Sequence, residues 1–95
     1  MRVRYTPRAL ADLKRIYAYI HARSPKGAAN VRAAIRRSAT SLTLVHRGQE
    51  TDKPDVLRVP VVRYQYAIYF RIREDHVEIV HIRHTSREPP ASGDM

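Results

Sequence analysis

The chain has 95 residues and carries 18 Lys plus Arg against 9 Asp plus Glu, a formal charge of +9. One compact domain is expected at this length, and an apolar content of 43% is too high for a disordered basic tail. No apolar run approaches the ~18 residues of a membrane span, and no signal peptide is visible. The lack of cysteine excludes disulfides, thiolate metal sites and a Cys nucleophile. These features predict a small, basic, cytoplasmic protein.

The positive charge comes from 15 Arg and only 3 Lys. Arg presents a planar fork that binds phosphate or carboxylate through two hydrogen bonds, whereas Lys acts mainly as a point charge. A small domain with this balance typically binds nucleic acid, an acidic protein, or both. A GC-rich genome would account for the ratio of Arg to Lys but not for the excess of nine positive charges.

The first half of the chain has the pattern of a short strand and two helices. Residues 2–5 alternate polar and apolar side chains, as a half-buried strand does. Thr6-Pro7 and Ser24-Pro25 each combine an N-cap residue with Pro at the first helical position, so a helix is predicted to begin at each pair. Because the connection between the helices is very short, we expect an antiparallel hairpin. The two predicted apolar stripes are Leu10, Leu13, Ile16, Tyr17 and Ile20, and then Ala28, Val31, Ala34 or Ile35, Ala39 and Leu42.

The second half has the pattern of a loop followed by three strands. Apolar periodicity is lost over residues 46–55, which predicts a loop. Residues 56–59 resemble a strand that Pro60 confines to an edge or a bulge. Residues 66–73 alternate, and residues 76–83 carry apolar side chains on both faces, as a central strand does. The acidic pair between these last two segments is short enough for a tight hairpin turn.

The expected order of elements is therefore β-α-α-β-β-β. Helices laid on one face of a small, mainly antiparallel sheet make the fold α+β. A single domain is expected over residues 1–87. Residues 88–95 contain two prolines and a glycine and are expected to form a disordered tail.

Several short motifs follow one another between Val3 and Arg87. They are Tyr5-Thr6-Pro7-x-Ala9-x-x-Asp12-Leu13-x-x-Ile16-x-x-Tyr19-Ile20, Ser24-Pro25 with Ala28, Leu42 and Gly48, Arg58 ahead of Tyr66-Ala67-Ile68-Tyr69-Phe70, and Val77-x-Ile79-x-x-x-x-His84-x-x-Arg87. In their order and spacing they resemble the RelE/ParE superfamily of small bacterial toxins from type II toxin–antitoxin (plasmid stabilisation) modules. The chain departs from the family in one loop, where Val45-His46 replaces a frequent proline and Gln49 rather than Arg follows the glycine.

The resemblance implies one of two activities. RelE-like members cut mRNA on the ribosome, whereas ParE-like members bind and poison DNA gyrase. In both branches an antitoxin segment wraps the toxin and keeps it inactive. The resemblance therefore implies a toxin with no cofactor, monomeric by itself and part of a larger complex with its antitoxin.

Cutting RNA through the 2′-hydroxyl requires a base, cations for the charged phosphorane and an acid for the leaving oxygen. Cations are plentiful here, but Gln65-Tyr66-Ala67 stands where a catalytic Arg is expected, and no Tyr follows Arg87. The pattern is closer to the ParE-like branch. A gyrase-binding toxin is thus the first hypothesis, a RelE-type mRNA endonuclease the alternative, and a basic nucleic-acid-binding module a third.

The candidate site residues differ between these hypotheses. No catalytic residue is assigned to a gyrase-binding toxin. A nuclease would use Arg58, Arg83, His84 and Arg87, which pairing of the second and last strands is expected to bring to one end of the sheet. The residues expected to contact gyrase or nucleic acid are Arg58, Arg63, Arg83, His84 and Arg87.

The second predicted helix carries Arg32, Arg36 and Arg37. They form either a solvated helix face or a contact for acidic antitoxin residues or nucleic acid. Because the chain is strongly positive, the antitoxin is expected to be acidic.

His81 and His84 raise the possibility of a metal site. Strand geometry sends residues at odd separation to opposite faces, so no metal is expected, and His81 is interpreted as a satisfied histidine at a strand end. Five tyrosines are interpreted first as residues of the core or of a partner groove, and stacking on nucleic-acid bases is the alternative. They are Tyr17, Tyr19, Tyr64, Tyr66 and Tyr69.

Overall fold

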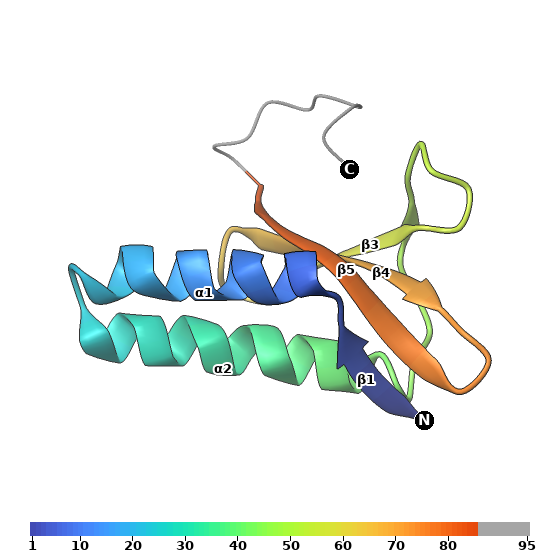
Figure 1. The fold of residues 1–95 in the computed structure, drawn as a ribbon, viewed down its shortest axis with the longest axis horizontal. Coiled ribbons are helices and arrows are strands. Elements are labelled where there is room, and N and C mark those ends of the chain that lie inside the picture. Colours follow the sequence, from blue (N-terminus) through green and yellow to red (C-terminus); the bar gives the residue numbers. More distant parts are fainter. Residues whose placement is uncertain (86–95) are drawn as a thin grey trace.

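The computed structural model of the chain describes residues 1–85. Its elements follow the predicted order with one addition, a two-residue strand in the predicted loop (Figure 1). The expected tail and Arg87 lie outside the described residues. The elements are β1 (Arg2–Tyr5), α1 (Pro7–His21), α2 (Pro25–Ser41), β2 (Gln49–Glu50), β3 (Leu57–Pro60), β4 (Tyr66–Ile72) and β5 (His76–His84).

Both helices begin where the sequence predicts. The hydroxyl of Thr6 accepts a hydrogen bond from the backbone N–H of Ala9 at 3.1 Å, and that of Ser24 accepts one from Gly27 at 2.9 Å. Each cap satisfies an N–H group that the first helical turn leaves without a partner. The helices run antiparallel beside each other, which confirms the predicted hairpin (Figure 1).

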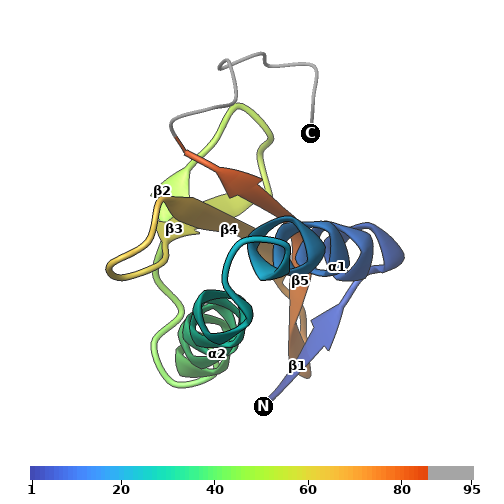
Figure 2. The ribbon, with the colours of Figure 1, turned by 90° about the vertical axis from the view of Figure 1, so that its left-hand side faces the viewer.

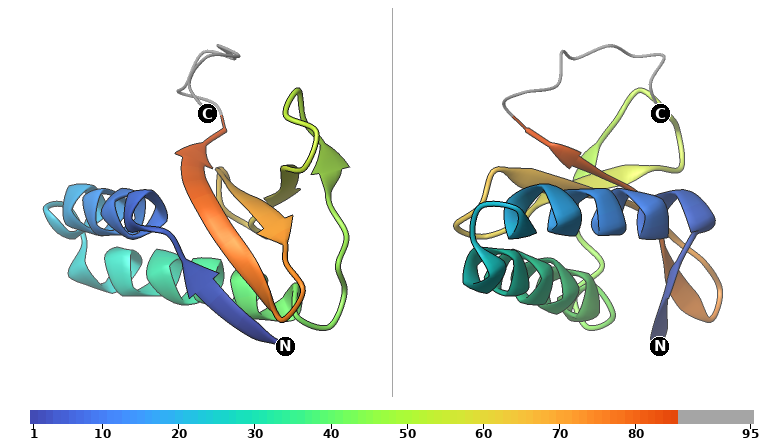
Figure 3. Two further views of the ribbon diagram at one scale, coloured as in Figure 1. Left: turned by 45° about the vertical axis from the view of Figure 1, so that its right-hand side comes forward. Right: turned by 60° about the vertical axis from the view of Figure 1, so that its left-hand side comes forward.

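Within residues 1–85, the five strands form one sheet in the order β1-β5-β4-β3-β2. β1 pairs parallel with β5, and all other neighbours are antiparallel. Both helices lie on the same side of this sheet (Figure 2), while β1 and β2 form its opposite edges (Figure 3). β5 is thus a central strand, as predicted. Pro60 lies at the end of β3, beyond the two residues that pair with β2. Its missing N–H therefore removes no hydrogen bond between β2 and β3.

The helix hairpin packs its apolar stripes on one face of the sheet. Ile35, Ile68, Phe70 and Ile79 are completely buried between the two layers. The predicted stripe of α1 needs one correction, because Leu10 is 44% exposed. The buried face of α1 consists instead of Ala9, Asp12, Leu13 and Ile16.

The predicted loop over residues 46–55 is also partly wrong, since it contains β2. This strand pairs with Leu57 and Arg58, and two exposed residues have no periodicity that a sequence could reveal. Gly48 precedes it against the core. A Cβ at this position would lie 2.9 Å from Cζ of Phe70 and 3.0 Å from the carbonyl oxygen of Arg58, so the close approach requires glycine.

A β-bulge interrupts the pairing of β4 with β5. Tyr69 pairs with His81 and Phe70 with Ile79, which leaves Val80 as the extra residue. The bulge shifts the alternation of side chains by one position. Ile79 and Ile82 therefore both belong to the core, while Val80 and His81 both line a hollow on the other face. The bulge therefore explains why apolar residues occur at both odd and even positions of β5.

Candidate functional site

The sheet face away from the helices is rich in arginine, and we call it the helix-free face. Outside the bulge of β5, its residues alternate with core residues along the strands, and the register aligns them in rows across the sheet. Four of the five strands each contribute an arginine to it. The helix-free face comprises Arg4, Arg58, Ala67, Tyr69, Arg71, Glu78, Val80, His81 and Arg83.

The start of α1 completes the edge of β5 where β1 ends. The N–H of Thr6 donates to the carbonyl oxygen of Ile79 at 3.0 Å, and the hydroxyl of Thr6 donates to that of Val80 at 3.3 Å. Six residues later, Oδ2 of Asp12 accepts a hydrogen bond from the N–H of Ile82 at 3.1 Å. Backbone groups that would otherwise be buried without partners are thereby satisfied by the helix.

Asp12 also holds the ring of His81. Nδ1 of His81 lies 2.5 Å from Oδ2 of Asp12, and Nη2 of Arg8 lies 3.5 Å from Nε2 of the same ring. An arginine has no acceptor, so Nε2 accepts and Nδ1–H donates to the carboxylate. Both ring nitrogens are thus engaged, as expected for a satisfied histidine, but the predicted strand end is wrong because β5 continues through His84.

The carboxylate of Asp12 is buried yet ionised. Burial raises its pKa, but hydrogen bonds from His81, the N–H of Ile82 and Arg15 outweigh this and hold the pKa below its usual value of 3.8. Arg15 donates to Oδ1 at 2.9 Å. No role for Asp12 is predicted from the sequence. The available signal was an acidic residue at helical spacing between Ala9 and Ile16.

The predicted contact residues occupy both faces of the sheet. Arg58 and Arg83 lie on the helix-free face, on strands that flank β4. His84 pairs with Tyr66 on the core side, where the two rings meet edge to face at 5.0 Å. β5 continues through His84, so strand alternation separates this residue from Arg58 and Arg83. The structure does not bring these three side chains together on one face.

The arginines of α2 have three different surroundings. Arg32 lies over the ring of Tyr17, 4.7 Å from its centroid, and so links the two helices. Burial raises the pKa of Tyr5, and the charge of Arg36 opposes that increase, which places Arg36 near the end of β1.

Arg37 instead faces the turn between β3 and β4. It borders a hollow of about 310 Å³ together with Arg63, which has a left-handed backbone (φ 76°) in that turn. Val62, 75% exposed, lines the same hollow. A surface hollow that is lined by an exposed apolar residue and two cations is suited to an amphipathic, acidic partner.

Comparison with known proteins identifies the family. The family model described as the ParE toxin of the parDE type II toxin–antitoxin system matches residues 3–89. A solved structure titled as the chromosomal ParDE toxin–antitoxin system from P. aeruginosa has the same fold, with a TM-score of 0.83 and 23% identity over 90% of this chain and 97% of that chain. A search of curated proteins gave no significant match. Within residues 1–85, neither helix has the length and apolar character needed to cross a membrane. The chain belongs to the ParE family of toxins from type II toxin–antitoxin systems.

Proposed function

We propose that this toxin stops growth by binding DNA gyrase and that an acidic antitoxin neutralises it. The observation that supports binding rather than chemistry is the state of His81 on the helix-free face. This ring is 6% exposed, donates to Asp12 and accepts from Arg8. A general base must have a nitrogen within reach of the substrate proton, and both ring nitrogens of His81 already face Asp12 and Arg8.

The second histidine of the candidate site supports the same proposal. His84 lies on the core side of β5, whereas Arg58 and Arg83 lie on the other face. Neither His81 nor His84 is therefore positioned to act as a base beside Arg58 and Arg83, which would stabilise a phosphorane. Arginines from several strands are instead suited to contact a large, negatively charged target, such as gyrase with its bound DNA.

Two assays on the purified protein separate the hypotheses. In the first, gyrase supercoils relaxed plasmid at increasing toxin concentration. In the second, mRNA on programmed ribosomes is mapped for new 5′ ends. We expect loss of supercoiling with intact mRNA, and filamentous cells with a DNA-damage response on expression. Efficient cleavage in the ribosomal A site would favour the RelE-type endonuclease, and inactivity in both assays would favour a plain nucleic-acid-binding module.

The antitoxin is proposed to carry an acidic amphipathic segment. The hollow beside Val62, with Arg37 and Arg63 at its border, offers such a segment one apolar contact and two cations. Rim charges mainly speed association and are screened beyond ~8 Å at physiological salt. Apolar contacts mainly set the dissociation rate.

Stopped-flow binding of the antitoxin tests whether charges control association and apolar contacts control dissociation. We expect higher salt to slow association strongly while changing dissociation little. Arg37→Gln should slow association, and Val62→Ser should speed dissociation. Lys14→Gln, which removes an equal charge from the exposed side of α1, is the control. A dissociation rate that rises steeply with salt at constant association rate would place the charges in the buried centre of the interface, contrary to the proposal.

A further inference from the structure

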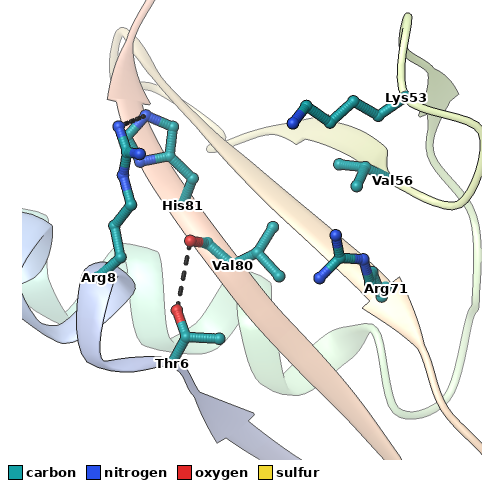
Figure 4. Close-up of a pocket in the computed structure, with 7 residues that line it drawn as sticks. All are labelled: Thr6, Arg8, Lys53, Val56, Arg71, Val80 and His81. Carbon is teal, nitrogen blue, oxygen red and sulfur yellow. Dashed lines mark hydrogen bonds between the residues drawn. The ribbon is translucent and has the colours of Figure 1, made fainter. Parts of the chain in front are cut away.

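A hollow of about 240 Å³ opens on the helix-free face beside the bulge of β5 (Figure 4). Four parts of the chain build it: the start of α1, the segment between β2 and β3, β4 and β5. Its lining residues are Thr6, Arg8, Lys53, Val56, Arg71, Val80 and His81.

The hollow has a strongly positive lining. Arg8, Lys53 and Arg71 reach it from three different elements, and none of the described residues that line it is acidic. The carboxylates nearest to Arg71 are Asp55, at 3.0 Å from Nε, and Glu78, at 3.5 Å from Nη1. Neither of them lines the hollow, so they stabilise Arg71 from outside it.

The wall of the hollow is fixed before any ligand arrives. The bulge directs both Val80 and His81 into it, which a regular strand would not do. His81 is held by Asp12, and Arg8 lies against the other nitrogen of the same ring. Thr6 is fixed by its bonds to β5 and to the first turn of α1. A site whose groups are already ordered loses less entropy when it binds a ligand.

The chemistry of the lining indicates the class of ligand. One arginine is sufficient for a single carboxylate, whereas two guanidinium groups and an ammonium group match an anion with two charges and several acceptor oxygens. Val80, which is partly exposed, adds an apolar surface beside the cations, where the organic part of an ester can lie, and the buried Val56 backs the hollow. We propose that this hollow binds the phosphate group of a nucleotide or of a nucleic-acid backbone.

The two sources of the phosphate are distinguished by the choice of probe. Amide chemical shifts of the isotope-labelled full-length chain are followed with inorganic phosphate, adenosine monophosphate, adenosine and a short DNA duplex. We expect saturable shifts around Thr6, Lys53 and Val80 with phosphate, and none with adenosine. Tighter binding of the monophosphate than of phosphate identifies a nucleotide site. Tighter binding of the duplex than of the monophosphate identifies a backbone site.

Three variants test whether the lining cations are responsible. Arg8→Gln and Lys53→Gln should each weaken binding by at least ~10-fold, because each removes a charge-assisted hydrogen bond. Lys14→Gln, on the exposed side of α1, should bind as the wild type does. Thermal melting of each variant shows that the fold is retained.

Several results would overturn the proposal. One is equal weakening of phosphate binding in all three variants. Another is binding of succinate, added as a dicarboxylate control, as tight as that of phosphate. The others are shifts scattered over the whole surface and no saturation with any probe. Because the assay contains no gyrase, its failure leaves the proposed function intact, and a failure to inhibit gyrase leaves this proposal intact.

Discussion

The two faces of the sheet are made from alternating residues of the same strands, and they differ in almost every property. On the covered face, Ile68 and Phe70 of β4 are completely buried against the helix hairpin. On the helix-free face, the neighbouring Arg71 meets Asp55 and Glu78 instead of apolar side chains. Burial of apolar area stabilises the fold at about 25 cal/mol per Å², whereas partly exposed ion pairs contribute little. The covered face therefore maintains the fold, whereas the helix-free face presents partly exposed cations such as Arg58 and Arg71 to the surface.

The largest expected effect separates two adjacent residues of β4. Phe70→Ala removes a completely buried ring and should lower the free energy of unfolding by about 3–5 kcal/mol. Arg71→Ala should lower it by about 1 kcal/mol or less, because its partner Asp55 is 63% exposed. Urea denaturation of both variants measures the difference. Equal losses would mean that the charged face is as important for stability as the core.

The next effect concerns Asp12, which links α1 to the sheet. Asp12→Ala would leave the ring of His81 and the N–H of Ile82 buried without their partner, and should cost about 3 kcal/mol or more. Arg15→Ala is the matched control, because it removes only the outer partner of the carboxylate, whose side chain is 63% exposed. It should cost less than about 1 kcal/mol. A loss for Arg15→Ala as large as that for Asp12→Ala would contradict the proposed role of the inner contacts.

A smaller effect is expected at Gly48, where the chain passes close to the ring of Phe70 before β2. Gly48→Ala places a Cβ 2.9 Å from Cζ of Phe70 and should cost about 1–3 kcal/mol. In a Phe70→Leu background that ring atom is absent, so the same substitution should cost less. A double-mutant cycle measured by denaturation gives the coupling, and additive losses would rule out the clash with the ring.

The dependence of stability on pH is the subtlest effect. The folded state holds the pKa of Asp12 below 3.8, so the unfolded chain takes up this proton at a higher pH than the folded chain. The stabilisation is therefore fully present above about pH 4 and is lost as the pH falls through the folded-state pKa. Between pH 5 and pH 2.5, the free energy of unfolding should fall more steeply in the wild type than in Asp12→Asn. Parallel curves would show that Asp12 does not contribute.

The sequence predicted the features that depend on local chemistry. Thr6-Pro7 and Ser24-Pro25 begin helices because capping needs only neighbouring residues. The turn at Glu74-Asp75 also forms, closed by a hydrogen bond from the N–H of Arg73 to the carbonyl oxygen of His76.

What the sequence did not reveal depends on contacts between distant segments. Asp12 is buried because it satisfies β5, 69 and 70 residues away, and this contact also orients α1 so that Ala9 rather than Leu10 faces inward. Strand β2 exists only because β3 is beside it. The bulge at Val80 likewise depends on pairing with β4.

The central claim is that the helix-free face is the functional surface of this toxin. The most direct test is growth arrest after induction of Arg58→Glu, compared with Lys26→Glu, which reverses an equal charge at the exposed start of α2. Both proteins should melt at nearly the wild-type temperature, because substitutions at such sites rarely change stability by more than ~0.5 kcal/mol. We predict that Arg58→Glu allows colonies to form while Lys26→Glu remains toxic. Folded Arg58→Glu protein that arrests growth as the wild type does would contradict the claim.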